Sequence, residues 1–219
     1  MNRKFALPAL LSLLLISAIA EAQVIVVTPP PPRRAKLRRG GEGLPKFKPT
    51  LNFSIGYGFP DVDKKYLPDY YGYNRGSTSQ SGVITGALDY RFSRRMSVGV
   101  LVTHGTVSAP YYDYSYPSTV PDLTARFDTW SYMIQLVRYI PISLRVVPYI
   151  KTGIGFNSWK QKYTDAYGNE AAVTPADVPD FARQISLGVK FRLSERAGFF
   201  VEGGYGKYIV SGGLSVKLL

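Results

Sequence analysis

"GVITGALDYRFSRRMSVGVLV", residues 82–102, decides the fold class because large apolar side chains recur at every second position on both sides of a short polar break. Ile84, Tyr90 and Phe92 share one parity, whereas small or polar residues occupy the other. Period two predicts two strands, and "SRR" at 93–95 predicts a tight turn between them. In a water-soluble sheet the apolar face covers a core. Here the opposite face is small enough to fill a narrow lumen, which leaves the apolar face for lipid.

The same alternation recurs along the rest of the chain. Together with the opening hairpin it predicts eight strands of about 10 residues, which suffices to cross the hydrocarbon when the strands are tilted. An even number is what a closed antiparallel barrel with both ends on one side requires. The sequence therefore predicts an all-β fold, an eight-stranded antiparallel up-and-down transmembrane β-barrel. The six further strands are expected at residues 50–58, 127–139, 147–156, 183–193, 198–206 and 212–219.

Short and long connections alternate between these strands. Outer-membrane barrels place short turns in the periplasm and long loops outside, so we expect a periplasmic C-terminus and extracellular long loops. Aromatic residues near both ends, Tyr139 and Trp159 among them, are expected to lie in the interface girdles. The short turns are predicted at 93–95, 140–143 and 194–197, and the long loops at 59–81, 108–123 and 158–180.

The first 48 residues differ from the rest. Residues 1–22 combine a basic start, an apolar run and "AEA", which predicts a secretory signal peptide. Residues 23–48 contain four consecutive prolines and a basic run, which predicts an extended periplasmic linker, followed by the barrel at 49–219. The linker is interpreted either as a solvated spacer or as a tether to an anionic periplasmic or cell-wall partner. Its candidate residues are Arg33, Arg34, Lys36, Arg38 and Arg39.

The chain resembles a family, the small eight-stranded outer-membrane β-barrel proteins of the OmpX and OmpA-barrel type. The signal peptide, the alternating strands, "PYIKTGIGF" and the terminal "GLSVKLL" carry the resemblance, which covers roughly residues 49–219. It implies a bacterial outer-membrane location among membrane lipids and lipopolysaccharide. Members of the family serve as adhesins, structural tethers, resistance factors or lipid-modifying enzymes, so the fold alone does not determine the function.

The enzyme interpretation depends on the only histidine, His104. Lipid A deacylases of this barrel type place a His and a Ser two residues apart on the outer wall, helped by a carboxylate. Here Thr106 replaces the serine, and Asp113 and Asp122 are expected in a loop, so no acid in the neighbouring sequence is placed to orient the imidazole. We therefore expect no catalytic residue. The chain contains no Cys, and no metal or cofactor site is expected.

Two sets of residues are candidates for binding or stability. Alternation sends charged side chains into the narrow lumen, where they must pair, because an isolated buried ion is very costly. The predicted lumen ion-pair network comprises Asp89, Arg91, Lys151, Lys190, Arg192, Glu202 and Lys217. Adjacent strands are expected to bring Glu202 near Lys190 or Arg192 on one side and Lys217 on the other. The long loops are rich in Tyr, which gives large contact area at low entropy cost and suits recognition of an extracellular ligand. The loop candidates are Tyr70, Tyr71, Tyr73, Tyr111, Tyr112 and Tyr114.

These features predict a non-enzymatic outer-membrane barrel with a filled lumen and a structural or cell-surface interaction role. The alternatives are a narrow channel and, less favoured, a lipid A-modifying enzyme. A monomer is expected. Nucleic acid is not an expected partner despite the formal net charge of +12, because the chain is predicted to be exported and much of the excess charge lies in the linker.

Overall fold

The computed structural model describes residues 47–115, 119–140 and 145–218. The expected signal peptide, and the linker up to residue 46 with its five basic candidates Arg33, Arg34, Lys36, Arg38 and Arg39, lie outside the described residues. Most of the described chain is β-strand and it contains a single short 3-10 helix, in agreement with the predicted fold class. Among the residues described, no helix is long and apolar enough to cross a membrane.

Nine strands and one short 3-10 helix, η3, make up the described chain. Their bounds are β1 Thr50–Asp61, η3 Val62–Tyr66, β2 Tyr73–Arg75, β3 Ser79–Arg91, β4 Met96–Asp113, β5 Leu123–Tyr139, β6 Val146–Asp165, β7 Phe181–Arg192, β8 Ala197–Tyr205 and β9 Tyr208–Lys217. All of the strands except the three-residue β2 belong to one antiparallel ring, in which each strand pairs with the ring strands that precede and follow it.

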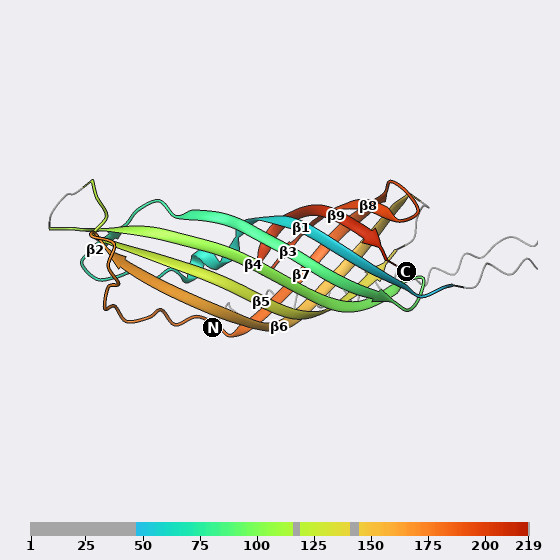
Figure 1. Ribbon diagram of the computed structural model, residues 1–219, viewed down its shortest axis with the longest axis horizontal. Coiled ribbons are helices and arrows are strands. Elements are labelled where there is room, and N and C mark those ends of the chain that lie inside the picture. The colour runs from blue at the N-terminus through green and yellow to red at the C-terminus, as the bar shows by residue number, and fades with distance from the viewer. Residues whose placement is uncertain (1–46, 116–118, 141–144, 219) are drawn as a thin grey trace, which may run out of the picture. The chain divides into compact units, whose positions relative to one another are not determined.

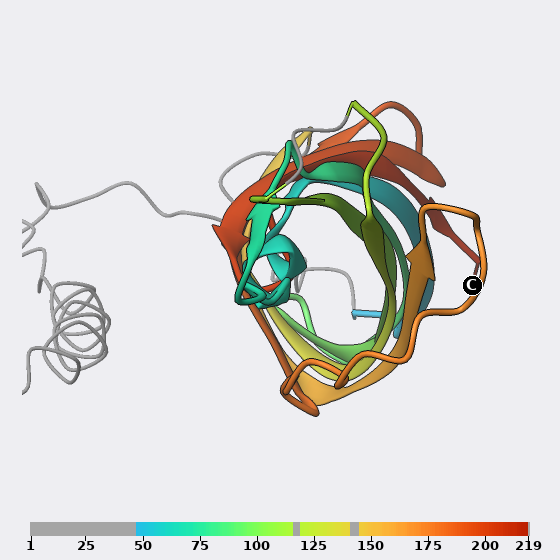
Figure 2. The ribbon, with the colours of Figure 1, turned by 90° about the vertical axis from the view of Figure 1, so that its left-hand side faces the viewer.

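The ring closes where the first and last strands meet. β1 pairs with β9 with Ile55 opposite Leu214, and β4 pairs with β5 along its whole length, so no barrel strand is left with an open edge over the shared height. Closure satisfies the backbone N–H and C=O groups within the protein, which a membrane requires. Figure 2 shows the strands as a closed ring with η3 lying inside it. The predicted eight-stranded up-and-down barrel is confirmed.

The two faces of the ring have opposite chemistry. Outward side chains are large, apolar and exposed; Ile134 and Ile154 are 67% and 62% exposed. Inward side chains at the same height are polar and buried, for example Thr103, Gln135 and Glu202. A water-soluble barrel would place its bulky apolar residues inside. A continuous apolar band on the outside belongs to a barrel that spans a membrane.

The two ends of the barrel differ in the length of the connections between strands. The short-turn end carries the connections at 92–95, 140–145 and 193–196, together with residues 47–49. The long-loop end carries the connections at 62–78, 114–122 and 166–180.

Three neighbouring strands continue past the rest at the long-loop end. β4, β5 and β6 have 18, 17 and 20 residues, against 9 in β8 and 10 in β9. Figure 1 shows them reaching beyond the other strands to the end where β2 pairs with β4. The predicted loops at 108–123 and 158–180 are therefore too long, because their first residues are strand. We call β2 and the projecting parts of β4, β5 and β6 (residues 73–75, 105–113, 123–129 and 157–165) the extension.

Candidate functional site

The lumen at mid-height contains a buried ion pair. Lys151 Nζ lies 2.5 Å from Glu202 Oε1, and the two side chains are 9% and 1% exposed. Two tyrosines complete the shell of the carboxylate: Tyr149 donates its hydroxyl to Oε2 at 2.8 Å, and Tyr208 donates to Oε1 at 2.6 Å. Alternation along β6 and β8 aims Lys151 and Glu202 into the barrel, and the narrow ring brings non-adjacent strands within reach. The sequence suggested Lys190, Arg192 or Lys217 as partners of Glu202, whereas the structure brings it to Lys151.

Asp89, the other inward acid of the predicted network, has a neutral partner. Gln135 donates its side-chain amide to Asp89 Oδ1 at 2.7 Å, and both side chains are buried. The space left around these groups is small, about 50 Å³. The lumen is therefore filled by side chains at this level.

An apolar layer closes the lumen below the ion pair, towards the short-turn end. Val137, Tyr139, Val147, Tyr149 and Phe200 form a buried cluster across the ring. The expectation that Tyr139 lies in a lipid-facing girdle was wrong. Its parity on β5 is that of the buried Val137 and Gln135, so its ring points inward.

Three cations of the predicted network, Arg91, Arg192 and Lys217, lie on the far side of this layer, and Lys190 borders both that side and the small mid-height space lined by Asp89 and Glu202. Arg91, Lys190, Arg192 and Lys217 line a cavity of about 480 Å³ at the short-turn end. No carboxylate lies within 4 Å of Lys190, Arg192 or Lys217 in the described part of the chain. The arginine stacks instead on an aromatic ring, with the Arg91 guanidinium 4.3 Å from the centre of the Tyr139 ring. The structure thus divides the predicted network between a buried ion pair and a basic cavity.

A second buried ion pair closes the lumen at the long-loop end. Lys207 Nζ lies 2.5 Å from Asp63 Oδ2 and donates to Asn157 Oδ1 at 3.2 Å. The helix η3 holds Asp63 there, because Asp61 accepts a hydrogen bond from the Asp63 backbone N–H at 2.9 Å and caps the helix. The ammonium of Lys207 also lies 5.1 Å from the centre of the Trp159 ring. Sequence reasoning missed this pair, because it placed both ends in loops.

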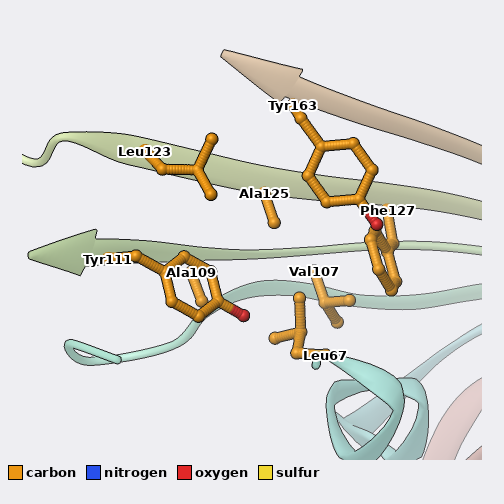
Figure 3. Close-up of a cluster of buried hydrophobic side chains, with 8 residues drawn as sticks. All are labelled: Leu67, Val107, Ala109, Tyr111, Leu123, Ala125, Phe127 and Tyr163. Carbon is orange, nitrogen blue, oxygen red and sulfur yellow. The ribbon is translucent and has the colours of Figure 1, made fainter. Parts of the chain in front are cut away.

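The inward face of the extension has its own apolar core. Leu67 and Tyr111 pack there with side chains of β4, β5 and β6 (Figure 3). Trp159 also packs against this core, so its predicted place in a lipid-facing girdle was wrong. The buried members are Leu67, Val107, Ala109, Tyr111, Leu123, Ala125, Phe127 and Tyr163.

Hydrogen bonds fix the loops that cover this core. Tyr111 donates its hydroxyl to the Pro68 carbonyl at 2.6 Å, and Arg75 donates to the Leu67 carbonyl at 2.9 Å. On the other side, Gln161 donates to the Ala176 carbonyl at 2.9 Å. The extension is therefore a packed sheet with pinned loops.

The loop tyrosines separate into exposed and buried groups. Tyr71 and Tyr114 are exposed, and Tyr70, Tyr73 and Tyr112 are half-buried. Tyr111 is wholly buried, so its expected exposure was wrong. The strand alternation of β4 continues through it and places it beside Val107 and Ala109 on the inward face. Burial raises the pKa of the Tyr111 hydroxyl to about 12.

The structure places a carboxylate beside the two residues weighed for catalysis. Asp128 of β5 lies opposite Thr106 of β4, and the Thr106 hydroxyl donates to Asp128 Oδ1 at 2.6 Å. The His104 ring stacks on Trp130 at 4.4 Å, and its Nδ1 lies 3.3 Å from the Thr129 carbonyl. Sequence reasoning missed Asp128, since strand register and not sequence spacing brings it there. In a catalytic triad the imidazole accepts the proton of the hydroxyl, and the carboxylate accepts a hydrogen bond from the imidazole. Here the Asp128 carboxylate instead accepts the hydrogen bond of the Thr106 hydroxyl itself.

The outward face of the extension is basic just beyond the aromatic residues. Arg126 lies directly opposite Lys162, and Asp128 directly opposite Lys160, on the face that carries Trp130 further down. Like charges directly opposite are unfavourable. Asp128 lies 3.4 Å from Arg126 and compensates only part of this charge. We call Arg126, Lys160 and Lys162 the basic wall.

In the described part of the chain, no three His, Asp or Glu side chains are grouped so that they could hold a metal ion. Neither a family model nor a curated protein sequence matches the chain.

Several solved structures are similar to it. The N-terminal β-barrel domain of Pseudomonas aeruginosa OprF shares 11% identity over 78% of this chain and 97% of that one, with a TM-score of 0.39. Ail, the attachment invasion locus protein of Yersinia pestis, solved with the heparin analogue sucrose octasulfate, shares 12% identity over 77% and 94%, with a TM-score of 0.38. A de novo designed transmembrane β-barrel shares 15% over 77% and 95%, with a TM-score of 0.41. At these values the likeness extends to the barrel and not to a function.

Proposed function

We propose that the protein is a closed, non-enzymatic barrel of the bacterial outer membrane with a structural and cell-surface interaction role. Its long-loop end faces outward and its short-turn end faces the periplasm. The single observation that carries the proposal is the packed extension, which continues a filled barrel beyond the apolar band. Residues 123–129 of β5 alone add roughly 23 Å of strand beyond Trp130 at about 3.3 Å per residue.

The filled lumen supports this role over that of a channel. Two buried ion pairs, one at mid-height and one beneath the long loops, lie in series with the apolar layer around Tyr139 and Phe200. An ion crossing the barrel would have to displace all three. The full chain in planar bilayers should therefore show no steady conductance. A stable open level in the unmodified protein would favour the channel alternative and overturn the closed barrel.

The basic wall supports an interaction with the outer leaflet. Arg126 and Lys162 lie four residues beyond the Trp130–Ser158 pair, about 13 Å along strands that tilt by about 45°. We infer from this distance that their charges lie at the level of the headgroups. Arginine and lysine bind phosphate through charge-assisted hydrogen bonds, and we assign the wall to the phosphates of lipopolysaccharide. The extension would then contact the outer leaflet through the basic wall. Tyr71 and Tyr114 are exposed at its loops and would be available to an extracellular ligand.

Stabilisation by the lipid tests the assignment. The temperature at which the folded gel band converts to the unfolded band should rise when the full chain is reconstituted with lipopolysaccharide, and rise less with dephosphorylated lipopolysaccharide. Arg126→Gln/Lys162→Gln should lose this phosphate-dependent difference. Lys64→Gln/Arg138→Gln removes the same charge from exposed positions outside the wall and should keep it. A response of the first variant equal to that of the unmodified protein would contradict the assignment.

A further inference from the structure

The cavity at the short-turn end has an unusual charge balance. Seven basic side chains line it and one acid, Glu195, accompanies them. They come from separate parts of the ring: Arg91 from β3, Lys217 from β9, and Lys190 and Arg192 from β7. Turns and the entering chain contribute the rest. The complete basic set is Lys48, Arg91, Arg94, Lys190, Arg192, Arg196 and Lys217.

The fold explains why two of the inward charges, Arg192 and Lys217, have no carboxylate within 4 Å in the described part of the chain. Asp89 is bound to Gln135, and Glu202 to Lys151, on the far side of the apolar layer. Tyr139 and Val147 of that layer form the floor of the cavity. The two inward acids of this half of the barrel are therefore occupied. Alternation aims Arg91, Arg192 and Lys217 inward below the floor, where they face one another, which is unfavourable without a counter-ion.

The positions of the charges also favour a soluble ligand over a lipid. Arg91, Lys190, Arg192 and Lys217 share the inward parity of their strands, so the barrel wall separates them from the surrounding bilayer. A lipid headgroup would have to leave the bilayer plane to reach them. A cavity of about 480 Å³ is in the size range of small-molecule sites.

We propose that this cavity is a binding site for a soluble, multiply charged phosphate compound. Arginines of the set, Arg192 and Arg196 among them, offer planar, bidentate donors that match phosphate oxygens, and three lysines add point charges. The stack of Arg91 on Tyr139 holds one guanidinium over the floor. With the orientation proposed above the cavity opens to the periplasm. The binding itself does not depend on that orientation or on the basic wall.

The test uses the full chain in nanodiscs of phosphatidylcholine, with tripolyphosphate titrated in a calorimeter. We expect saturable binding with one site per chain, weakening as salt is raised. Arg192→Gln/Lys217→Gln should weaken binding by about tenfold or more, because two charge-assisted contacts are lost. Both side chains are exposed, so the variant should fold, which its heat-modifiable gel mobility checks.

Matched controls separate this site from general attraction to a basic protein. Arg138→Gln/Arg183→Gln removes the same charge from the outward face of β5 and β7 and should bind tripolyphosphate like the unmodified chain. Equal weakening of binding in both variants would overturn the site. The absence of saturable binding up to about 1 mM tripolyphosphate, which corresponds to a binding free energy of about −4 kcal/mol, would overturn it as well. A second arm replaces part of the phosphatidylcholine with cardiolipin and omits tripolyphosphate. Stabilisation by cardiolipin without any binding of tripolyphosphate would overturn the soluble ligand.

Discussion

Replacing Glu202 by Ala should destabilise the barrel strongly, because Glu202 is the acceptor at the centre of the lumen. Within the described part of the chain, the change removes the only carboxylate within 4 Å of Lys151, and it leaves the hydroxyl of Tyr149 without its acceptor. Lys151 keeps one polar neighbour, the Tyr208 hydroxyl at 2.9 Å. Breaking a buried ion pair from one side costs about 3–5 kcal/mol, since a buried charge stays uncompensated. Because the tyrosine bonds belong to the same network, their loss is counted within that range.

The assay is equilibrium unfolding by urea of the full chain in phospholipid vesicles. The two tryptophans report different regions: Trp130 faces lipid and Trp159 packs in the extension. For an m-value of about 2 kcal/mol/M, a loss of about 4 kcal/mol moves the midpoint by about 2 M. The change should appear at both tryptophans if the barrel unfolds as one unit.

Two further variants make the result decisive. Asp69→Ala removes an exposed pair with Arg75, 84% exposed on the acid side, and should cost less than about 1 kcal/mol. Lys151→Met/Glu202→Leu removes both charges and should recover most of the stability that Glu202→Ala loses. If Glu202→Ala costs no more than Asp69→Ala, or if the double variant shows no recovery, the reasoning about the buried pair is refuted.

Two other changes probe the long-loop end. Gly105→Ala should destabilise the chain by about 1–3 kcal/mol, because the added Cβ would collide with the buried Asp61 carboxylate that caps η3. Gly86→Ala places its Cβ in open space and should be near neutral in the same unfolding assay. Equal effects of the two variants would contradict the packing of η3 against β4. The extension should also lose stability as pH rises from about 10 to about 12. A tyrosine in the unfolded chain ionises near pH 10, whereas burial raises the pKa of Tyr111 in the folded chain to about 12. No loss is therefore expected below pH 10. Hydrogen exchange across this pH range should show a smaller loss in Tyr111→Phe than in the unmodified chain or in Tyr71→Phe. Some loss should remain in Tyr111→Phe, because burial also raises the pKa of Tyr70 in the same core. A loss in Tyr111→Phe equal to that of the unmodified chain would contradict the assignment to Tyr111.

The candidate residues show where inference from the chain alone stops. Alternation predicted correctly that Asp89, Lys151 and Glu202 point inward, because side-chain direction in a strand depends only on parity. It did not predict that Glu202 reaches Lys151, since that contact spans the ring between β6 and β8. For the same reason Asp128 was missed beside Thr106: the two are 22 residues apart and meet only through the register of β4 and β5.

The sequence by itself determined the all-β class, the number of barrel strands and the apolar outward face. These follow from a period of two, which is local and repeats at every strand. Only the tertiary structure decided how far β4, β5 and β6 project, which tyrosines are buried beneath Leu67, and how the inward charges divide between the mid-height ion pair and the basic cavity. Those outcomes depend on strand register and on contacts across a closed ring. A residue's own neighbours in sequence carry no information about what faces it from the opposite wall.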